Sequence, residues 1–85
     1  MSKADEMFEE LGYKKVREDN DSWEIRFIKE FKLKRPRHII FSNDKSICVC
    51  EENERELAVK RDWFDMQELQ AINEKVKELG WNENI

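Results

Sequence analysis

Residues 65–81, with the sequence DMQELQAINEKVKELGW, decide the fold of this chain. Asp65 is a good helix-capping residue, and Glu68 follows three positions later, where its side chain can complete a capping box. Apolar residues recur at steps of three and four and form one stripe of a helix: Met66, Leu69, Ile72, Val76 and Leu79. Gly80 can adopt the left-handed conformation that ends a helix, and Trp81 can then fold back onto the last turn. The segment therefore predicts an amphipathic helix that docks on a flat surface.

A shorter helix is predicted at the start of the chain, over residues 2–11. Ser2 followed by Asp5 resembles a capping box. The apolar stripe of this helix consists of Ala4, Met7, Phe8 and Leu11. Gly12 is expected to stop the helix and to bring Tyr13 back onto its last turn, which is the same ending that Gly80 and Trp81 give the C-terminal helix.

The segment between the two helices has the pattern of short strands. Residues 23–27 alternate between apolar and charged side chains, as in a half-buried strand, and the alternation is expected to continue through Phe31 and Leu33. Pro36 ends this strand, because proline cannot donate to a central ladder. The predicted strands cover residues 13–17, 23–27, 38–42 and 46–51, with a fifth, weaker strand at 56–60. Turn signals at residues 18–21, 43–45 and 52–54 separate them.

These elements define an α+β fold. Short turns force neighbouring strands to pair antiparallel, which gives a meander sheet of four to five strands. One face of the sheet needs cover, and the N-terminal and C-terminal helices are the elements that can pack on it. With 85 residues, the chain is predicted to be one domain over residues 1–85, because two smaller units would each lack a core. The pattern leaves the strand register, and hence the identity of the buried face, open.

The composition indicates a folded, highly charged protein. Charged residues make up 42% of the chain and hydrophobic residues only 39%, but 11% are aromatic, which argues for a packed core rather than disorder. The net charge of −4 gives no overall attraction to nucleic acid or anionic lipid. No apolar run approaches the ~20 residues of a membrane span, and residues 1–8 lack the apolar region of a signal peptide. We therefore expect a cytoplasmic protein without a membrane partner.

The residues with the most reactive side chains do not form a convincing catalytic or metal site. Cys48 and Cys50 share one face of a predicted strand and are expected to be buried or half-buried structural thiols, since a C-x-C pair with a single histidine falls short of a closed zinc site. His38 could act as a base for either cysteine if their strands pair, but the chain has only two glycines and both are assigned to helix ends. We favour a bystander histidine, no enzymatic activity, no metal and no cofactor.

A basic cluster is the most interesting polar feature. It places five positive charges within nine residues, against Glu30 alone: Lys29, Lys32, Lys34, Arg35 and Arg37. Phe31 and His38 are interleaved with these cations as possible stacking groups for bases. One interpretation is contact with a nucleic-acid backbone through Lys32, Lys34, Arg35 and Arg37. The other interpretation, which we favour, is an exposed loop whose cations protect a sheet edge from aggregation.

Both ends of the chain resemble a known group of proteins. Residues 4–13, ADEMFEELGY, and residues 66–81, MQELQAINEKVKELGW, are similar to the ends of small proteins from phages and prophages of Gram-positive bacteria. The resemblance covers about a third of the chain, and Asp65 stands where such proteins commonly carry Thr or Ser. The family is itself uncharacterised, so the resemblance implies a phage or prophage context but transfers no functional residue.

The sequence thus predicts a non-enzymatic accessory protein of phage or prophage type in the host cytoplasm. We expect it to act through protein contacts, either with an unidentified protein partner or by self-association. The alternative is a nucleic-acid-binding accessory protein that uses the basic cluster. No feature indicates a small-molecule substrate.

Overall fold

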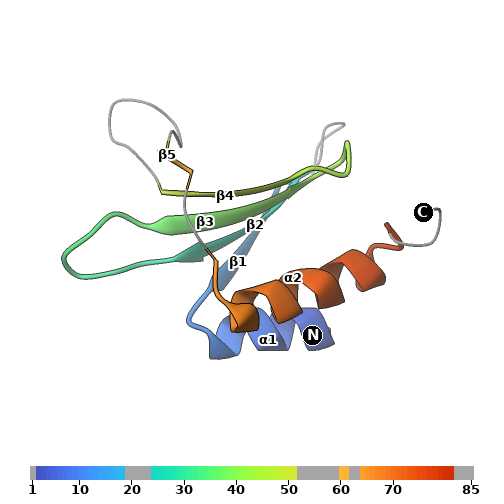
Figure 1. Ribbon diagram of the computed structural model, residues 1–85, viewed down its shortest axis with the longest axis horizontal. Helices are drawn as coiled ribbons and strands as arrows, with labels where there is room; N and C mark the ends of the chain where they lie inside the picture. Colours follow the sequence, from blue (N-terminus) through green and yellow to red (C-terminus); the bar gives the residue numbers. More distant parts are fainter. Residues whose placement is uncertain (1, 19–23, 52–59, 62–63, 82–85) are drawn as a thin grey trace.

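Five antiparallel strands and two helices make up the fold in the computed structural model, which describes residues 2–18, 24–51, 60–61 and 64–81. The elements follow the order α1 (Lys3–Glu10), β1 (Lys14–Glu18), β2 (Glu24–Lys29), β3 (Arg37–Ser42), β4 (Ile47–Glu51), β5 (Lys60–Arg61) and α2 (Met66–Glu78). The strands are ordered β1-β2-β3-β4-β5, so each pairs with its neighbour in sequence. Figure 1 shows α1 and α2 side by side below one face of the sheet. The predicted α+β meander with both helices on one face is confirmed.

The strand boundaries differ from the predicted ones by one residue at the starts of β1, β3 and β4, and by more at the end of β2. β1 begins one residue late, because the backbone N–H of Tyr13 donates to the carbonyl of Phe8 as part of the helix stop. β2 ends at Lys29, so the alternation does not continue through Phe31 and Leu33, and Leu33 is 98% exposed. Residues 30–36 instead form the connection to β3. The described part of the fifth strand is Lys60–Arg61. Trp23, most of the predicted turn at 18–21, the predicted turn at 52–54 and most of the predicted strand at 56–60 lie outside the described residues.

The core lies between the helices and the odd-numbered residues of β2 and β3. In the register of these strands, Ile25 is opposite Phe41 and Phe27 is opposite Ile39, and all four side chains are buried. Phe8 of α1 stacks on Phe27 with 4.0 Å between the ring centroids. Burying each such aromatic side chain contributes roughly 1.5–3 kcal/mol. The buried face is therefore the one that carries residues 25, 27, 39 and 41.

Both helices end as their sequences predict, but α1 begins with only half of the predicted capping box, in which the Ser2 hydroxyl accepts from the N–H of Asp5 at 3.1 Å. Asp65 and Glu68 form a complete capping box at the start of α2. After α2, Gly80 has a φ of 73°, and the N–H of Trp81 donates to the carbonyl of Val76 over 3.1 Å, as in a Schellman motif. The motif brings the Trp81 ring to 6.1 Å from that of Phe41 in the core. Met66 is the exception to the predicted apolar stripe, because it is 66% exposed at the first turn of α2.

A buried lysine joins the two helices. Lys75 of α2 is 2% exposed, and its ammonium donates to Asp5 of α1 at 2.7 Å and to Glu78. Lys15 of β1 donates to the second oxygen of Asp5 at 3.0 Å. Burial alone would raise the pKa of the Asp5 carboxyl, but the hydrogen bonds from the two lysines outweigh burial and lower that pKa. The cluster fixes α1 against α2 and β1 by charge as well as by apolar contact.

Replacement of Asp5 by Asn should destabilise the fold at neutral pH by about 1.5–3 kcal/mol, because Lys75 loses one of its two carboxylate partners. The pKa of Asp5 is lower in the folded chain than in the unfolded chain, so its contribution is present above about pH 4 and is lost as the pH falls through the folded value. The gap in unfolding free energy between wild type and Asp5→Asn, measured with urea at several pH values, should therefore be full at pH 7 and close on acidification.

Glu10→Gln provides the matched control, because Glu10 is exposed at the end of the same helix. It should change the unfolding free energy by less than about 0.5 kcal/mol. A gap for Asp5→Asn that stays constant from neutral to strongly acidic pH would contradict the assigned role of the Asp5 carboxylate.

Candidate functional site

On the core-facing side of the sheet, the side chains change from apolar to charged at the end where residues 30–36 connect β2 to β3. Lys29, the last residue of β2, is opposite Arg37, the first residue of β3, and Arg37 is opposite Glu51 at the end of β4. Because side chains alternate along a strand, these three residues lie on the same face as Phe27 and Ile39. A row of two cations and one carboxylate therefore lies between the apolar core and the connection formed by residues 30–36.

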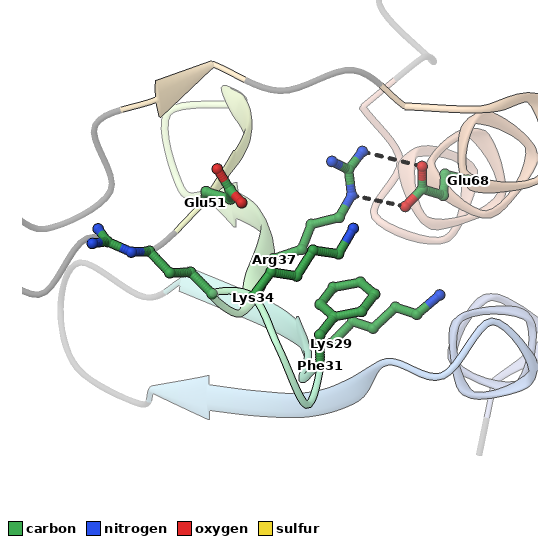
Figure 2. A pocket seen from close by; sticks show the side chains of 7 residues that line it. Lys29, Phe31, Lys34, Arg37, Glu51 and Glu68 are labelled. Carbon is green, nitrogen blue, oxygen red and sulfur yellow. Dashed lines mark hydrogen bonds and ion pairs between the residues drawn. The ribbon is translucent and has the colours of Figure 1, made fainter.

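Arg37 is held by the C-terminal helix. Its Nε donates to Oε2 of Glu68 at 3.0 Å and its Nη2 donates to Oε1 at 3.1 Å, which is a bidentate contact (Figure 2). The Tyr13 hydroxyl donates to Oε2 of Glu68 and accepts from the Arg37 Nε at 2.9 Å. Oε1 of Glu68 also accepts from the N–H of Asp65 at 2.9 Å, so the carboxylate that caps α2 is the one that binds Arg37.

Burial and charge set the ionisation of this cluster. Arg37 and Glu68 are each 8% exposed and Tyr13 is 4% exposed. Burial and the hydrogen bond to the Glu68 carboxylate raise the pKa of Tyr13 well above its usual value, so the hydroxyl stays protonated. Burial alone would lower the pKa of Arg37, but its contacts with Glu68 and Tyr13 reverse this effect and raise it. Arg37 is thus a permanent cation whose charge is neutralised inside the protein.

A pocket of about 300 Å³ opens beside this cluster (Figure 2). It is lined by Lys29, Phe31, Lys34, Arg35, Arg37, Glu51 and Glu68, and we call it the basic pocket. The Nζ of Lys34 lies 4.3 Å from the centroid of the Phe31 ring, and the Nζ of Lys29 lies 5.5 Å from the same centroid. Cation–π attraction to one ring therefore gathers two ammonium groups at the pocket.

Gly12 contributes to the position of Lys29. Gly12 has a φ of 94°, and a Cβ atom at this position would lie 3.3 Å from the Cε of Lys29. The stem of Lys29 thus runs close to the backbone at the end of α1, and its Nζ lies 5.8 Å from the centroid of the Tyr13 ring. The helix stop after α1 leaves the space that this lysine occupies.

The structure separates the cations that the sequence grouped as one nucleic-acid contact. Lys34 and Arg35 are exposed and line the basic pocket. Arg37 also lines it, but its guanidinium is already bound by Glu68. Lys32 is exposed on the same connection and does not line the pocket. Lys29 does, although the predicted contact set did not include it.

Sequence reasoning also missed the two carboxylates of the pocket, Glu51 and Glu68, because they come from β4 and α2. The only available signal was the position of Glu68 in the capping box, and that signal concerns the helix alone. His38, by contrast, does not belong to this surface. It is 4% exposed and follows Arg37 on the alternate face of β3, so it does not serve as a stacking group beside the basic pocket.

The two cysteines differ in exposure. Both are free thiols; Cys50 is buried, as predicted, but Cys48 is exposed, so that part of the prediction is wrong. Cys50 is opposite Arg61 of β5, whereas no described β5 residue is opposite Cys48. Cys50 is also opposite His38 in the β3–β4 register. Burial, together with Cys48, raises the pKa of the Cys50 thiol to about 11, so it is a neutral thiol at pH 7 rather than an activated nucleophile.

Within the described part of the chain, no three His, Cys, Asp or Glu side chains are grouped so that they could hold a metal ion. Neither described helix combines the length and the apolar composition needed to cross a bilayer. Comparisons with models of protein families, with curated proteins and with solved structures find no match to this chain. The basic pocket and the connection formed by residues 30–36 combine several cations, an aromatic ring and an exposed leucine.

Replacement of Arg37 by Met should destabilise the protein by about 3–5 kcal/mol, because it leaves the Glu68 carboxylate buried without its cation. Arg37→Met combined with Glu68→Gln should be more stable than Arg37→Met alone, since the amide keeps an oxygen for the helix cap and carries no charge. Chemical denaturation of the two single variants and the double variant measures this coupling.

Lys32→Met is the matched control for the loss of a cation, and it should change stability by less than about 0.5 kcal/mol. Additive effects of Arg37→Met and Glu68→Gln would show that the two side chains do not depend on each other, which would overturn the assigned interaction.

Proposed function

We propose that this chain is a non-catalytic binding protein that docks on an acidic surface of a protein partner through the connection formed by residues 30–36, which we call the basic loop. The observation that carries the proposal is Leu33, whose side chain is 98% exposed. A single exposed leucine is ordinary on a protein surface. Leu33 is distinguished by its neighbours, because Lys32, Lys34 and Arg35 surround it in sequence and all three are exposed. An apolar centre with a charged rim is the usual composition of a protein-binding patch.

The basic loop is attached to rigid structure at both ends, which favours binding. It leaves β2 at Lys29 and enters β3 at Arg37, which Glu68 holds against α2. Within the loop, Phe31 is half-buried and carries Lys34 on its ring. Less conformational entropy is lost on binding when the segment is already ordered in this way.

The distribution of charge supports an acidic partner. The chain has a net charge of −4, and α1 exposes Glu6, Glu9 and Glu10. An acidic partner is repelled by most of the protein and attracted by the basic loop, so the charge pattern orients the encounter and selects the docking face. Screening at physiological salt limits this effect to charges within about 8 Å of each other, so the cations next to Leu33 matter most.

A phage or prophage accessory role in the host cytoplasm completes the proposal. Its support is the resemblance of residues 4–13 and 66–81 to small phage and prophage proteins. These two segments contain α1, α2 and the helix stops after them. The resemblance therefore concerns the helical layer that carries the sheet, whereas the basic loop lies outside the two segments that resemble such proteins.

Nucleic acid is the second candidate partner, and the cations that line the basic pocket favour it. Lys34 and Arg35 are exposed and can reach phosphate groups, as can Lys32. Two observations place this candidate behind the protein partner. The guanidinium of Arg37 is bound by Glu68, and the Phe31 ring interacts with the ammonium groups of Lys29 and Lys34 instead of presenting a clear face to a base.

A photo-crosslinking experiment tests the proposal and separates the two candidates. Leu33 is replaced by benzoylphenylalanine, which keeps an apolar group at the centre of the patch, and the protein is produced and irradiated in Gram-positive bacterial cells. We expect one predominant adduct that protease destroys and nuclease leaves intact. The adduct should fall at least about tenfold when Lys34 and Arg35 are also replaced by Ser, because the rim charges orient the encounter.

The control places the same crosslinker at Gln70, which is exposed on α2 and does not line the basic pocket. Gln70 follows Glu68 by two residues, so the two side chains lie on opposite sides of the helix. It should not give the adduct. An adduct at position 33 that nuclease destroys would replace the protein partner by nucleic acid. Equal labelling from positions 33 and 70 would refute recognition by the basic loop.

A further inference from the structure

We infer that the basic pocket is a binding site for a phosphate monoester, that is, for a dianionic phosphoryl group attached through one oxygen to the rest of its ligand. This inference goes beyond the docking role of Leu33, because Leu33 does not line the pocket. It rests on four observations: the unpaired cations of the pocket, their net charge, their arrangement and the pocket size.

The first observation is that the pocket contains cations without carboxylate partners. Other buried or half-buried cations of the described chain are paired: Arg37 with Glu68, Arg26 with Glu24, and Lys75 with Asp5 and Glu78. No ion pair joins Lys29, Lys34 or Arg35 to a carboxylate among the described residues. Like charges that line one pocket repel each other, and a bound anion relieves this repulsion.

The second observation is the charge balance. Four cations and two carboxylates line the pocket, which leaves two positive charges. The Arg37–Glu68 pair is internally neutral, so the excess comes from Lys29, Lys34 and Arg35 set against Glu51. A phosphate monoester carries about 1.5 to 2 negative charges at pH 7, whereas a carboxylate or a phosphodiester carries about one. The monoester therefore matches the excess most closely.

The third observation is the arrangement of the donors. The Nζ atoms of Lys29 and Lys34 lie 5.5 and 4.3 Å from the centroid of the Phe31 ring, so one ring attracts two ammonium groups at the pocket before any ligand arrives. Arg35 adds a planar guanidinium, whose forked donors suit the oxygens of a phosphate. Figure 2 shows Lys29, Lys34 and Phe31 beside the Arg37–Glu68 pair, which forms a fixed wall of the pocket.

The fourth observation is size. The volume of about 300 Å³ lies at the lower end of the range for small-molecule sites. It admits a phosphoryl group and a small attached group, but not a stacked nucleotide chain. The ligand is therefore either a small phosphorylated molecule or the terminal phosphate of a larger one.

Isothermal titration calorimetry with phenyl phosphate at pH 7.5 and low salt tests the inference. We expect saturable binding at one site, and at least about tenfold weaker binding of benzoate, which has the same ring and a single charge. Affinity for phenyl phosphate should fall between pH 7.5 and pH 5, because the phosphate dianion takes up one proton near pH 6 and becomes a monoanion.

Three variants locate the binding site. Lys29→Ser should weaken the binding of phenyl phosphate at least about tenfold, whereas Lys32→Ser removes the same charge from the same region outside the pocket and should leave it nearly unchanged. Glu51→Gln should tighten binding several-fold, because it removes the carboxylate that opposes the anion. A gain of affinity cannot arise from misfolding, so this variant keeps the test meaningful even if Lys29→Ser is unstable.

Two outcomes would overturn the inference: equal binding of benzoate and phenyl phosphate, or equal losses for Lys29→Ser and Lys32→Ser. A single-stranded oligonucleotide with and without a 5′-phosphate then identifies the source of the phosphate. Tighter binding of the 5′-phosphorylated form than of phenyl phosphate assigns the pocket to nucleic-acid ends, and equal or weaker binding assigns it to small ligands. Leu33→Ser should leave phosphate binding intact, so failure of the docking proposal and failure of this inference are distinguishable.

Discussion

The bidentate contact between Arg37 and Glu68 is the interaction on which the rest of this structure depends. Glu68 has two tasks, because one carboxylate both caps α2 and binds a guanidinium that projects from the first residue of β3. The start of the C-terminal helix is thereby fixed to one end of the sheet. Tyr13, which follows the stop of α1, joins the same carboxylate. One buried group thus connects three parts of the chain that are distant in sequence.

Buried charges help to select one arrangement of strands and helices in this protein, whose apolar core is small. The apolar core is formed by a few aromatic and aliphatic side chains, and clusters around Glu68 and Lys75 connect its helices and strands. Buried ion pairs give little net stability, because desolvation offsets most of the attraction. They do penalise wrong arrangements: a one-residue slip of β3 would turn Arg37 to the other face of the sheet and leave Glu68 buried without a cation. This penalty favours the observed register.

The same arrangement determines which cations are available for recognition. Arg37 is neutralised by Glu68, so it contributes a wall to the basic pocket and not a binding charge. Lys29 is its neighbour across the β2–β3 ladder and has no carboxylate partner among the described residues. The chain as a whole is acidic, yet five of its 16 Lys and Arg residues fall within residues 29–37, around an exposed Leu33. An apolar docking point and an anion pocket at one end suit a protein that binds rather than catalyses.

Local features of the fold could be predicted from the sequence, because the interacting residues are close in the chain. The capping box of α2 and the two glycine helix stops involve residues three to five positions apart, and all three are confirmed. The prediction that the strand continues through Leu33 was wrong. Leu33 continues the apolar–polar alternation of β2, and alternation alone does not show whether such a residue is in a strand or in the exposed connection that follows it.

The ion clusters and the site were harder to predict, because their partners are far apart in sequence. Glu68 is 31 residues from Arg37 and 55 from Tyr13, and Lys75 is 70 from Asp5. No pattern of spacing links such pairs. The basic cluster was recognised by charge density alone, but the distinction between Arg37, Lys32 and the cations of the pocket required the β2–β3 register and the position of α2. The sequence thus predicted the region in which the site lies, whereas the three-dimensional fold was needed to show which residues line it.

The most direct test of the central claim is a ¹H–¹⁵N spectrum of the arginine side chains at neutral pH, with Arg37 assigned by the loss of its peak in Arg37→Lys. The structure predicts a sharp, slowly exchanging Nε–H peak for Arg37, because this N–H is buried and donates to Glu68 and Tyr13. The peak of the exposed Arg35 should exchange faster and shift when phenyl phosphate is added, while that of Arg37 stays in place. An Arg37 N–H that exchanges as fast as that of Arg35, or that moves with the ligand in the same way, would contradict the assignment of Arg37 to the fold rather than to recognition.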